Sequence, residues 1–223
     1  MTQLFSKRFP LKRVKKSPFG YAVEYWIKHT KTVPQGQNAT SASKDLWNIV
    51  MDFLWSGDAA FDKWVGVNPT KLIGDSSYNW KKNNPGPLHV AAAFDLADVL
   101  DYAHPAEVDF SVQDNRGWSP LLWTAYQGSL RALAVLIERE DLNVNAAEKN
   151  GWTALMVASR NGFETMVDLL LQVKDIDVNL KKNDGGYALR LAGAENQEGI
   201  VKLLQQHGAR DFKNEPEQGD DIE

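Results

Sequence analysis

Residues 151–159 read GWTALMVAS and are the clearest copy of a unit that occurs four times in this chain. The turn glycine recurs at Gly117, Gly151 and Gly185, at intervals of 34 residues. The leucine that opens the apolar run recurs at Leu88, Leu121, Leu155 and Leu189. A fixed period of this length is typical of stacked supersecondary units that cannot bury their apolar faces alone. We therefore expect function on the surface of a stack and not in an enclosed pocket.

Each copy has the residues of a tight turn followed by two helices. The turn glycines supply a positive φ, and Ser119 and Thr153 are placed to cap the first helix of their copies. Pro120 suits a first helical position, where a backbone N–H is not needed. The apolar core of the second helix follows at residues 133–136, 167–170 and 201–204. Small residues let the first helices of neighbouring copies lie close together: Ala125, Ala158, Ser159, Ala192 and Gly193.

The four copies read PLHVAA at 87–92, SPLLWTA at 119–125, TALMVAS at 153–159 and YALRLAG at 187–193. They resemble the ankyrin repeat, which has a Thr-Pro-Leu-His-x-Ala signature and a period of about 33 residues. The resemblance implies an all-α ankyrin solenoid of about four repeats over residues 81–212, acting as a protein-binding scaffold. Tetratricopeptide repeats have a similar period but need a different aromatic start and no turn glycine, which disfavours that alternative.

The first and last copies depart from the pattern. The first has Asn84 in the slot of the turn glycine and few large aliphatic residues at 97–103. We therefore expect it to act as an adapter between the repeats and the segment that precedes them. The fourth has Tyr187 in place of the capping hydroxyl and Asn196 in place of a glycine. Its outer positions are polar: Lys202, Gln205, Gln206 and Arg210. A terminal capping repeat needs such a face because its outer side meets water.

Composition excludes several classes of site. The chain has 223 residues, 43% of them hydrophobic, and no cysteine, which excludes disulfides, thiolate metal sites and a cysteine nucleophile. We expect a cytoplasmic protein, with a nuclear location as an alternative. No apolar run approaches the roughly 20 residues of a membrane-spanning helix, so we expect no membrane span.

The two ends of the chain carry opposite charge. Residues 1–17 hold six basic residues and no acid, whereas residues 213–223 hold five acids and one lysine. We expect a flexible basic arm at 1–17 and a disordered acidic tail at 213–223. The arm leaves open a second function, a nucleic-acid or membrane-tethered adaptor, although a solvated linker is commoner. It lacks the interleaved aromatics of a single-strand binding surface, so a nucleic-acid partner is not expected.

Residues 18–80 differ from the repeats. Apolar residues fall at helical spacing, and five of the eight tryptophans are here. We expect a small helical capping region of three helices that packs on the first repeat. Its aromatic pattern, YA at 21–22, YW at 25–26, FL at 53–54 and FDKW at 61–64, is similar to the segment that precedes the ankyrin array in fungal NACHT-domain (NLR-like) proteins. The resemblance implies the sensor or scaffold part of such a receptor, or a truncated relative, and this chain has no phosphate-loop motif.

The residues that could support catalysis are scattered. The histidines are His29, His89, His104 and His207, and none has a partner at the spacing of a metal site or an activated nucleophile. We expect His89 and His207 to be structural. Asp95 and Asp98 form an i, i+3 pair that we expect on a solvated helix face. The sequence therefore predicts no catalytic, metal or cofactor site, and a protein that is not an enzyme.

The ankyrin resemblance implies binding through the turn tips and the exposed side of the first helices. Trp118 and Trp152 follow turn glycines and are expected to line up on one face, although each indole could instead pack on its own turn. Trp123 is expected in the core. Trp, Tyr and Arg dominate interface energetics. We predict a monomer that binds a protein partner through these residues: Phe94, Arg116, Trp118, Tyr126, Gln127, Lys149, Trp152, Arg160 and Asn161.

Overall fold

The computed structural model describes residues 80–102 and 109–212. The chain divides into two compact units, Met1–Pro87 and Leu88–Glu223. Of the first unit the described part contains α6 (Trp80–Asn83). The basic arm, the three helices expected within residues 18–80 and the acidic tail lie outside the described residues, so these domain assignments stay predictions.

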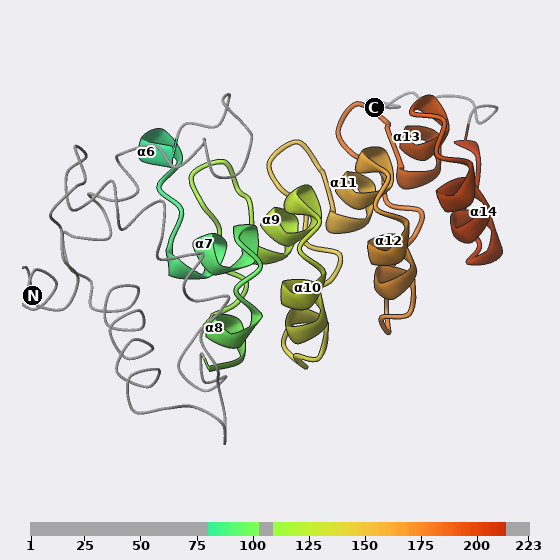
Figure 1. Cartoon of the computed structure of the whole chain (residues 1–223). Helices are drawn as coiled ribbons and strands as arrows, with labels where there is room; N and C mark the ends of the chain where they lie inside the picture. The colour runs from blue at the N-terminus through green and yellow to red at the C-terminus, as the bar shows by residue number, and fades with distance from the viewer. Residues whose placement is uncertain (1–79, 103–108, 213–223) are drawn as a thin grey trace, which may run out of the picture. The chain divides into compact units, whose positions relative to one another are not determined.

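From Pro87 onward, the helices of the described residues follow one another in pairs. Figure 1 shows the first helices of the pairs in one row and the second helices in another. The pairs are α7 (Pro87–Ala93) with α8 (Ala97–Tyr102), α9 (Pro120–Gln127) with α10 (Leu130–Ile137), α11 (Ala154–Asn161) with α12 (Glu164–Leu171), and α13 (Ala188–Ala194) with α14 (Glu198–Gln206). The predicted all-α solenoid of four repeats is confirmed.

The predicted caps begin the helices of the two central repeats. The Ser119 hydroxyl accepts a hydrogen bond from the Leu122 N–H at 3.3 Å, and the Thr153 hydroxyl accepts one from the Met156 N–H at 3.4 Å. These bonds satisfy amides that have no partner within the helix. Tyr187 precedes α13 without a side-chain cap, as the sequence predicts for the last repeat.

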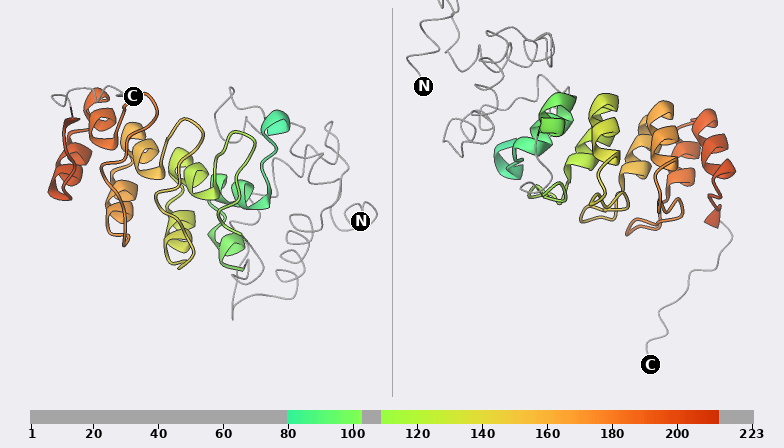
Figure 2. Two further views of the ribbon diagram at one scale, coloured as in Figure 1. Left: turned by 180° about the vertical axis from the view of Figure 1, so that it is seen from behind. Right: turned by 90° about the horizontal axis from the view of Figure 1, so that it is seen from below.

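Left-handed backbone recurs at one position in every turn. Gly151 has a φ of +84°, and Asn84 takes the same slot in the first repeat with a φ of +47°. A Cβ on Gly151 would lie 2.7 Å from the Lys182 Cα, so this glycine also allows the next turn to approach. The turns that join successive repeats project from one side of the stack (Figure 2).

The core runs between neighbouring repeats as well as within each one. Helix α11 packs against α9 and α13, and the alanines at these contacts, Ala125, Ala158 and Ala192, have no exposed surface. Leu133 and Leu170 are equally buried on the second helices. Each helix pair therefore covers the apolar face of the next, which is the defining contact of a solenoid.

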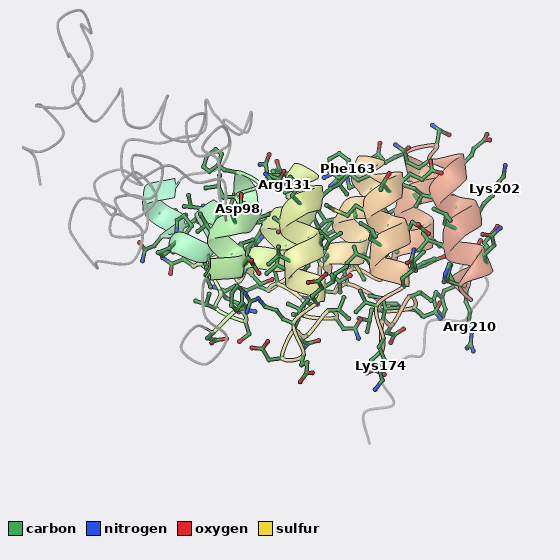
Figure 3. The ribbon with its side chains drawn as sticks, turned by 60° about the horizontal axis from the view of Figure 1, so that its bottom comes forward. Asp98, Arg131, Phe163, Lys174, Lys202 and Arg210 are labelled. Atoms are coloured by element: carbon green, nitrogen blue, oxygen red, sulfur yellow. The ribbon has the colours of Figure 1, made fainter. Side chains whose placement is uncertain are left out.

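The Asp95 and Asp98 carboxylates do not form a simple solvated face, which corrects the expectation from sequence. The Asp95 carboxylate accepts a hydrogen bond from the Ala132 N–H of the next repeat at 2.9 Å. Asp98 pairs with Arg131 at 3.1 Å across the same boundary, and the two side chains are labelled in Figure 3. Both acids thus contact the start of α10 in the second repeat, although the exposed Asp98–Arg131 pair adds little stability.

The last repeat is closed by a second set of contacts. The Tyr187 hydroxyl donates to the Asp211 carboxylate at 2.5 Å and accepts from the Phe212 N–H at 3.0 Å. The two rings meet edge to face at 4.9 Å. Burial, followed by the bond to Asp211, raises the pKa of Tyr187. The residue that replaces the capping hydroxyl therefore binds residues 211–212 beside the start of α13.

Replacement of a central leucine is expected to destabilise the protein more than replacement of a terminal one. Leu155 is 2% exposed between two neighbours, whereas Leu203 is partly exposed at the end of the stack. Leu155→Ala should lower the free energy of unfolding by about 2–5 kcal/mol, the range for buried leucines. Leu203→Ala should cost less and act more locally. Urea unfolding followed by circular dichroism measures both, and equal losses would contradict coupling between repeats.

Candidate functional site

The structure separates the predicted binding residues by exposure. Arg116, Lys149, Arg160 and Asn161 are exposed, and Tyr126, Gln127 and Trp152 are partly exposed. Phe94 and Trp118 are buried, with 6% and 9% of their surfaces exposed. We call the seven accessible residues the turn-tip surface.

The prediction that Trp118 stands open beside Trp152 is wrong. Its ring centroid lies 5.2 Å from the rings of both Trp123 and Tyr126, and the Arg116 guanidinium lies 4.9 Å from its ring. Trp123 has no exposed surface, as the sequence predicts. Trp118 therefore packs on its own repeat, which is the alternative that the sequence left open.

Trp152 remains accessible because the third repeat has no aromatic side chain at the positions equivalent to Trp123 and Tyr126. The residue one period after Trp123 is Val157, and the residue one period after Tyr126 is Arg160. The Arg160 guanidinium lies 5.5 Å from the Trp152 ring centroid, and the Lys182 ammonium lies 4.8 Å from it. Cations are attracted to the face of an indole. Trp152 thus lies close to cations of the third and fourth repeats.

Arg160 also reaches the last repeat. Its Nε lies 3.6 Å from a carboxylate oxygen of Glu195, and both side chains are about half exposed. An ion pair this exposed adds little stability because water screens it. The same guanidinium thus lies near both the Glu195 carboxylate and the Trp152 ring.

Two buried acids support the turns, and the sequence analysis did not single them out. The Asp114 carboxylate accepts hydrogen bonds from the N–H groups of Arg116 and Trp118, at 2.8 and 2.9 Å. Glu148 accepts from the Asn150 N–H at 2.8 Å. Asp114 and Glu148 are 34 residues apart, so the repeat spacing itself could have found them.

Hydrogen bonds also join successive turn tips. The Lys149 ammonium donates to the Asn115 carbonyl at 2.7 Å, and the Asn183 side-chain amide donates to the Lys149 carbonyl at 3.1 Å. On the first helices, the Asn161 amide donates to the Tyr126 carbonyl at 3.4 Å. These bonds thus link neighbouring turns and neighbouring first helices along the turn-tip surface.

Structural roles explain the described histidines. His89 Nε2 lies 3.0 Å from the Trp118 carbonyl and 3.2 Å from the Val112 carbonyl, and it is buried. His207 Nδ1 lies 2.9 Å from the Leu203 carbonyl.

Within residues 80–102 and 109–212, the His, Asp and Glu side chains form no group of three that could hold a metal ion. Across those residues no helix has the length and apolar character to cross a bilayer.

The model of the family "Ankyrin repeats (3 copies)" matches residues 88–182 and 140–217, which together cover more than half of the chain. This chain belongs to the ankyrin-repeat family. NF-kappa-B inhibitor alpha of Gallus gallus is 36% identical over 70 residues, which are 30% of this chain and 22% of that protein. The similarity thus spans about a fifth of the curated relative.

Ankyrin-repeat proteins are typically binding scaffolds without enzymatic activity. Membership of the family, together with the similarity to NF-kappa-B inhibitor alpha, supports a protein-interaction role and implies a protein partner.

The two turn tryptophans of this ankyrin-repeat protein are expected to differ in their effect on stability. Trp118→Ala removes a buried ring and should lower the free energy of unfolding by about 3–5 kcal/mol. Trp152→Ala should cost clearly less, since its ring is partly exposed. Chemical denaturation of both variants followed by circular dichroism tests this. Equal losses would show that Trp118 is not part of the core.

Proposed function

We propose that this chain is a protein-interaction scaffold that binds its partner through the turn-tip surface, centred on Trp152 and Arg160. The observation that carries the proposal is the partial exposure of the Trp152 indole close to two cations, whereas its counterpart Trp118 is buried. Tryptophan and arginine are both enriched among the residues that carry most of the binding energy of protein interfaces.

Rigidity of the turns favours binding. Each side chain that becomes ordered on association loses conformational entropy, and this loss lowers the affinity. Here the hydrogen bond from Lys149 to Asn115 and the bond from Asn183 to Lys149 already order the turn tips. A partner would meet a prearranged row of polar groups around one apolar ring.

We further propose a cytoplasmic monomer that is the sensor or scaffold part of a fungal NACHT-domain receptor or a truncated relative. Its support is the aromatic pattern within residues 21–64, which lies outside the described part of the chain. The name of the chicken relative states that it inhibits NF-kappa-B, but the matched segment is 22% of that protein. Binding of the same target is therefore no part of the proposal.

Trp152→Ala is expected to weaken partner capture by about 2 kcal/mol or more, as truncation at an interface hot spot does. Affinity purification with mass spectrometry on the wild type and the variant identifies the partner, and calorimetry with the purified partner gives the change in Kd. Leu130→Ala is the control, because Leu130 is 40% exposed and begins the second helix of its repeat. Unchanged capture by Trp152→Ala, or equal loss in both variants, would remove the turn-tip surface from the proposal.

A further inference from the structure

A groove of about 620 Å³ lies between the second and third repeats, at the ends of α10 and α12. It is lined by the loops that follow these helices and shares no residue with the turn-tip surface. In Figure 3, Phe163 marks the start of α12, and Lys174 lies in the loop beyond the other end of that helix, where its side chain projects outward. The groove is therefore a separate feature of the outer side of the stack.

The floor of the groove is apolar and only partly covered. Ile137 and Leu142 come from the second repeat, Leu169 and Val173 come from the third, and all of these side chains are partly exposed. Partly exposed aliphatic side chains that converge from two repeats gain free energy when another apolar group covers them. The floor thus provides a reason for a partner to bind here.

The walls of the groove are tied together across the repeat boundary. The Asn145 side-chain amide donates to the Asp175 carbonyl at 2.7 Å, and its oxygen accepts from the Asp177 N–H at 2.9 Å. One side chain thus bridges the two loops through both of its polar atoms. The two sides of the groove are thereby linked by hydrogen bonds.

The rim of the groove is acidic. The exposed carboxylates of Glu138, Glu140 and Asp175 stand around it, with Lys174 as a lining cation. Arg139 also lines the groove and keeps its positive charge, but its guanidinium is directed at the first repeat, where it donates to the Leu100 carbonyl at 2.6 Å and lies 3.7 Å from the Phe110 ring. The three rim carboxylates therefore outnumber the two lining cations.

The helices add to this negative potential. Both α10 and α12 end at the groove, and the partial negative charge of a helix C-terminus favours a nearby cation. An anion brought to the same place meets both the carboxylates and the helix ends. The potential therefore selects the sign of a ligand's charge.

We propose that this groove binds a segment of a partner protein in which apolar side chains are flanked by lysine or arginine. The apolar side chains cover the floor formed by Ile137, Leu142, Leu169 and Val173, and the cations meet the rim carboxylates. Complementary charge speeds encounter and excludes partners of the wrong sign. Acidic segments and nucleic acids are repelled. This site is independent of the proposed function, because it uses other residues on another side of the stack.

The test measures fluorescence anisotropy of a labelled peptide in which two leucines are flanked by lysine pairs, added to the full chain. We expect saturable binding that weakens with added salt, since exposed charges are screened. Glu138→Lys with Glu140→Lys should raise the Kd about tenfold or more, because the rim then repels lysine. Val173→Ser should also weaken binding by removing part of the floor.

Matched controls separate an effect of the groove from an effect of the net negative charge of the chain. Glu164→Lys with Glu198→Lys makes the same change in net charge at the starts of α12 and α14, and should leave the Kd unchanged. Glu138→Gln with Glu140→Gln should weaken binding less than the lysine pair, and it serves as the test if the lysine variant does not fold. Trp152→Ala should bind the peptide normally, so failure of the proposed function would not affect this result.

Several outcomes would overturn the inference. Equal binding of a peptide with glutamate in place of lysine would exclude charge selection. Equal weakening in the groove variants and the matched control, or unchanged binding in Val173→Ser, would show that the peptide does not occupy the groove. Binding that appears only after deletion of residues 1–17 would assign the groove to the chain's own basic arm and not to a partner.

Discussion

Ala125, Ala158 and Ala192 are fully buried where α9, α11 and α13 pack against one another. Because the alanine side chain extends only one carbon from the backbone, these helices can lie close together. Their spacing sets the separation of the turns that precede them, and with it the hydrogen bonds that join one turn tip to the next. A much larger side chain at these positions would overpack the contact, spread the repeats and separate the turns. The tight contact between first helices is thus the constraint on which both surfaces depend.

The repeats share one backbone arrangement but differ in their side chains. These differences produce the two candidate binding surfaces. Trp118 and Trp152 occupy the same position of successive repeats, but Trp123 and Tyr126 bury the first, whereas Val157 and Arg160 leave the second accessible. On the outer side, the loops at the ends of α10 and α12 leave an acidic groove. The repeat spacing sets the positions of the helices and turns. A few side-chain differences between repeats then determine which surfaces can bind a partner.

Much of the fold could be predicted from the 34-residue spacing, because turns and caps depend on local residues. Thr153 caps its helix as expected. Asn84, which the sequence marks as a departure from the turn glycine, nevertheless takes the left-handed turn position. The burial of Trp118 could not be predicted from its position, since it depends on how its ring meets others on α9. The role of Asp95 was missed for a similar reason: its hydrogen-bond partner Ala132 lies in the next repeat, 37 residues away. Contacts between repeats were the least predictable part.

Native-state hydrogen exchange on Ala158→Leu tests the dependence on close first helices most directly. The larger side chain overpacks α11 against α9 and α13, which should destabilise the stack by about 1–3 kcal/mol. We predict that amide protection falls in the neighbouring turns at residues 114–118 and 182–186 as well as in α11 itself. Loss of protection confined to α11, with both neighbouring turns unchanged, would contradict the account.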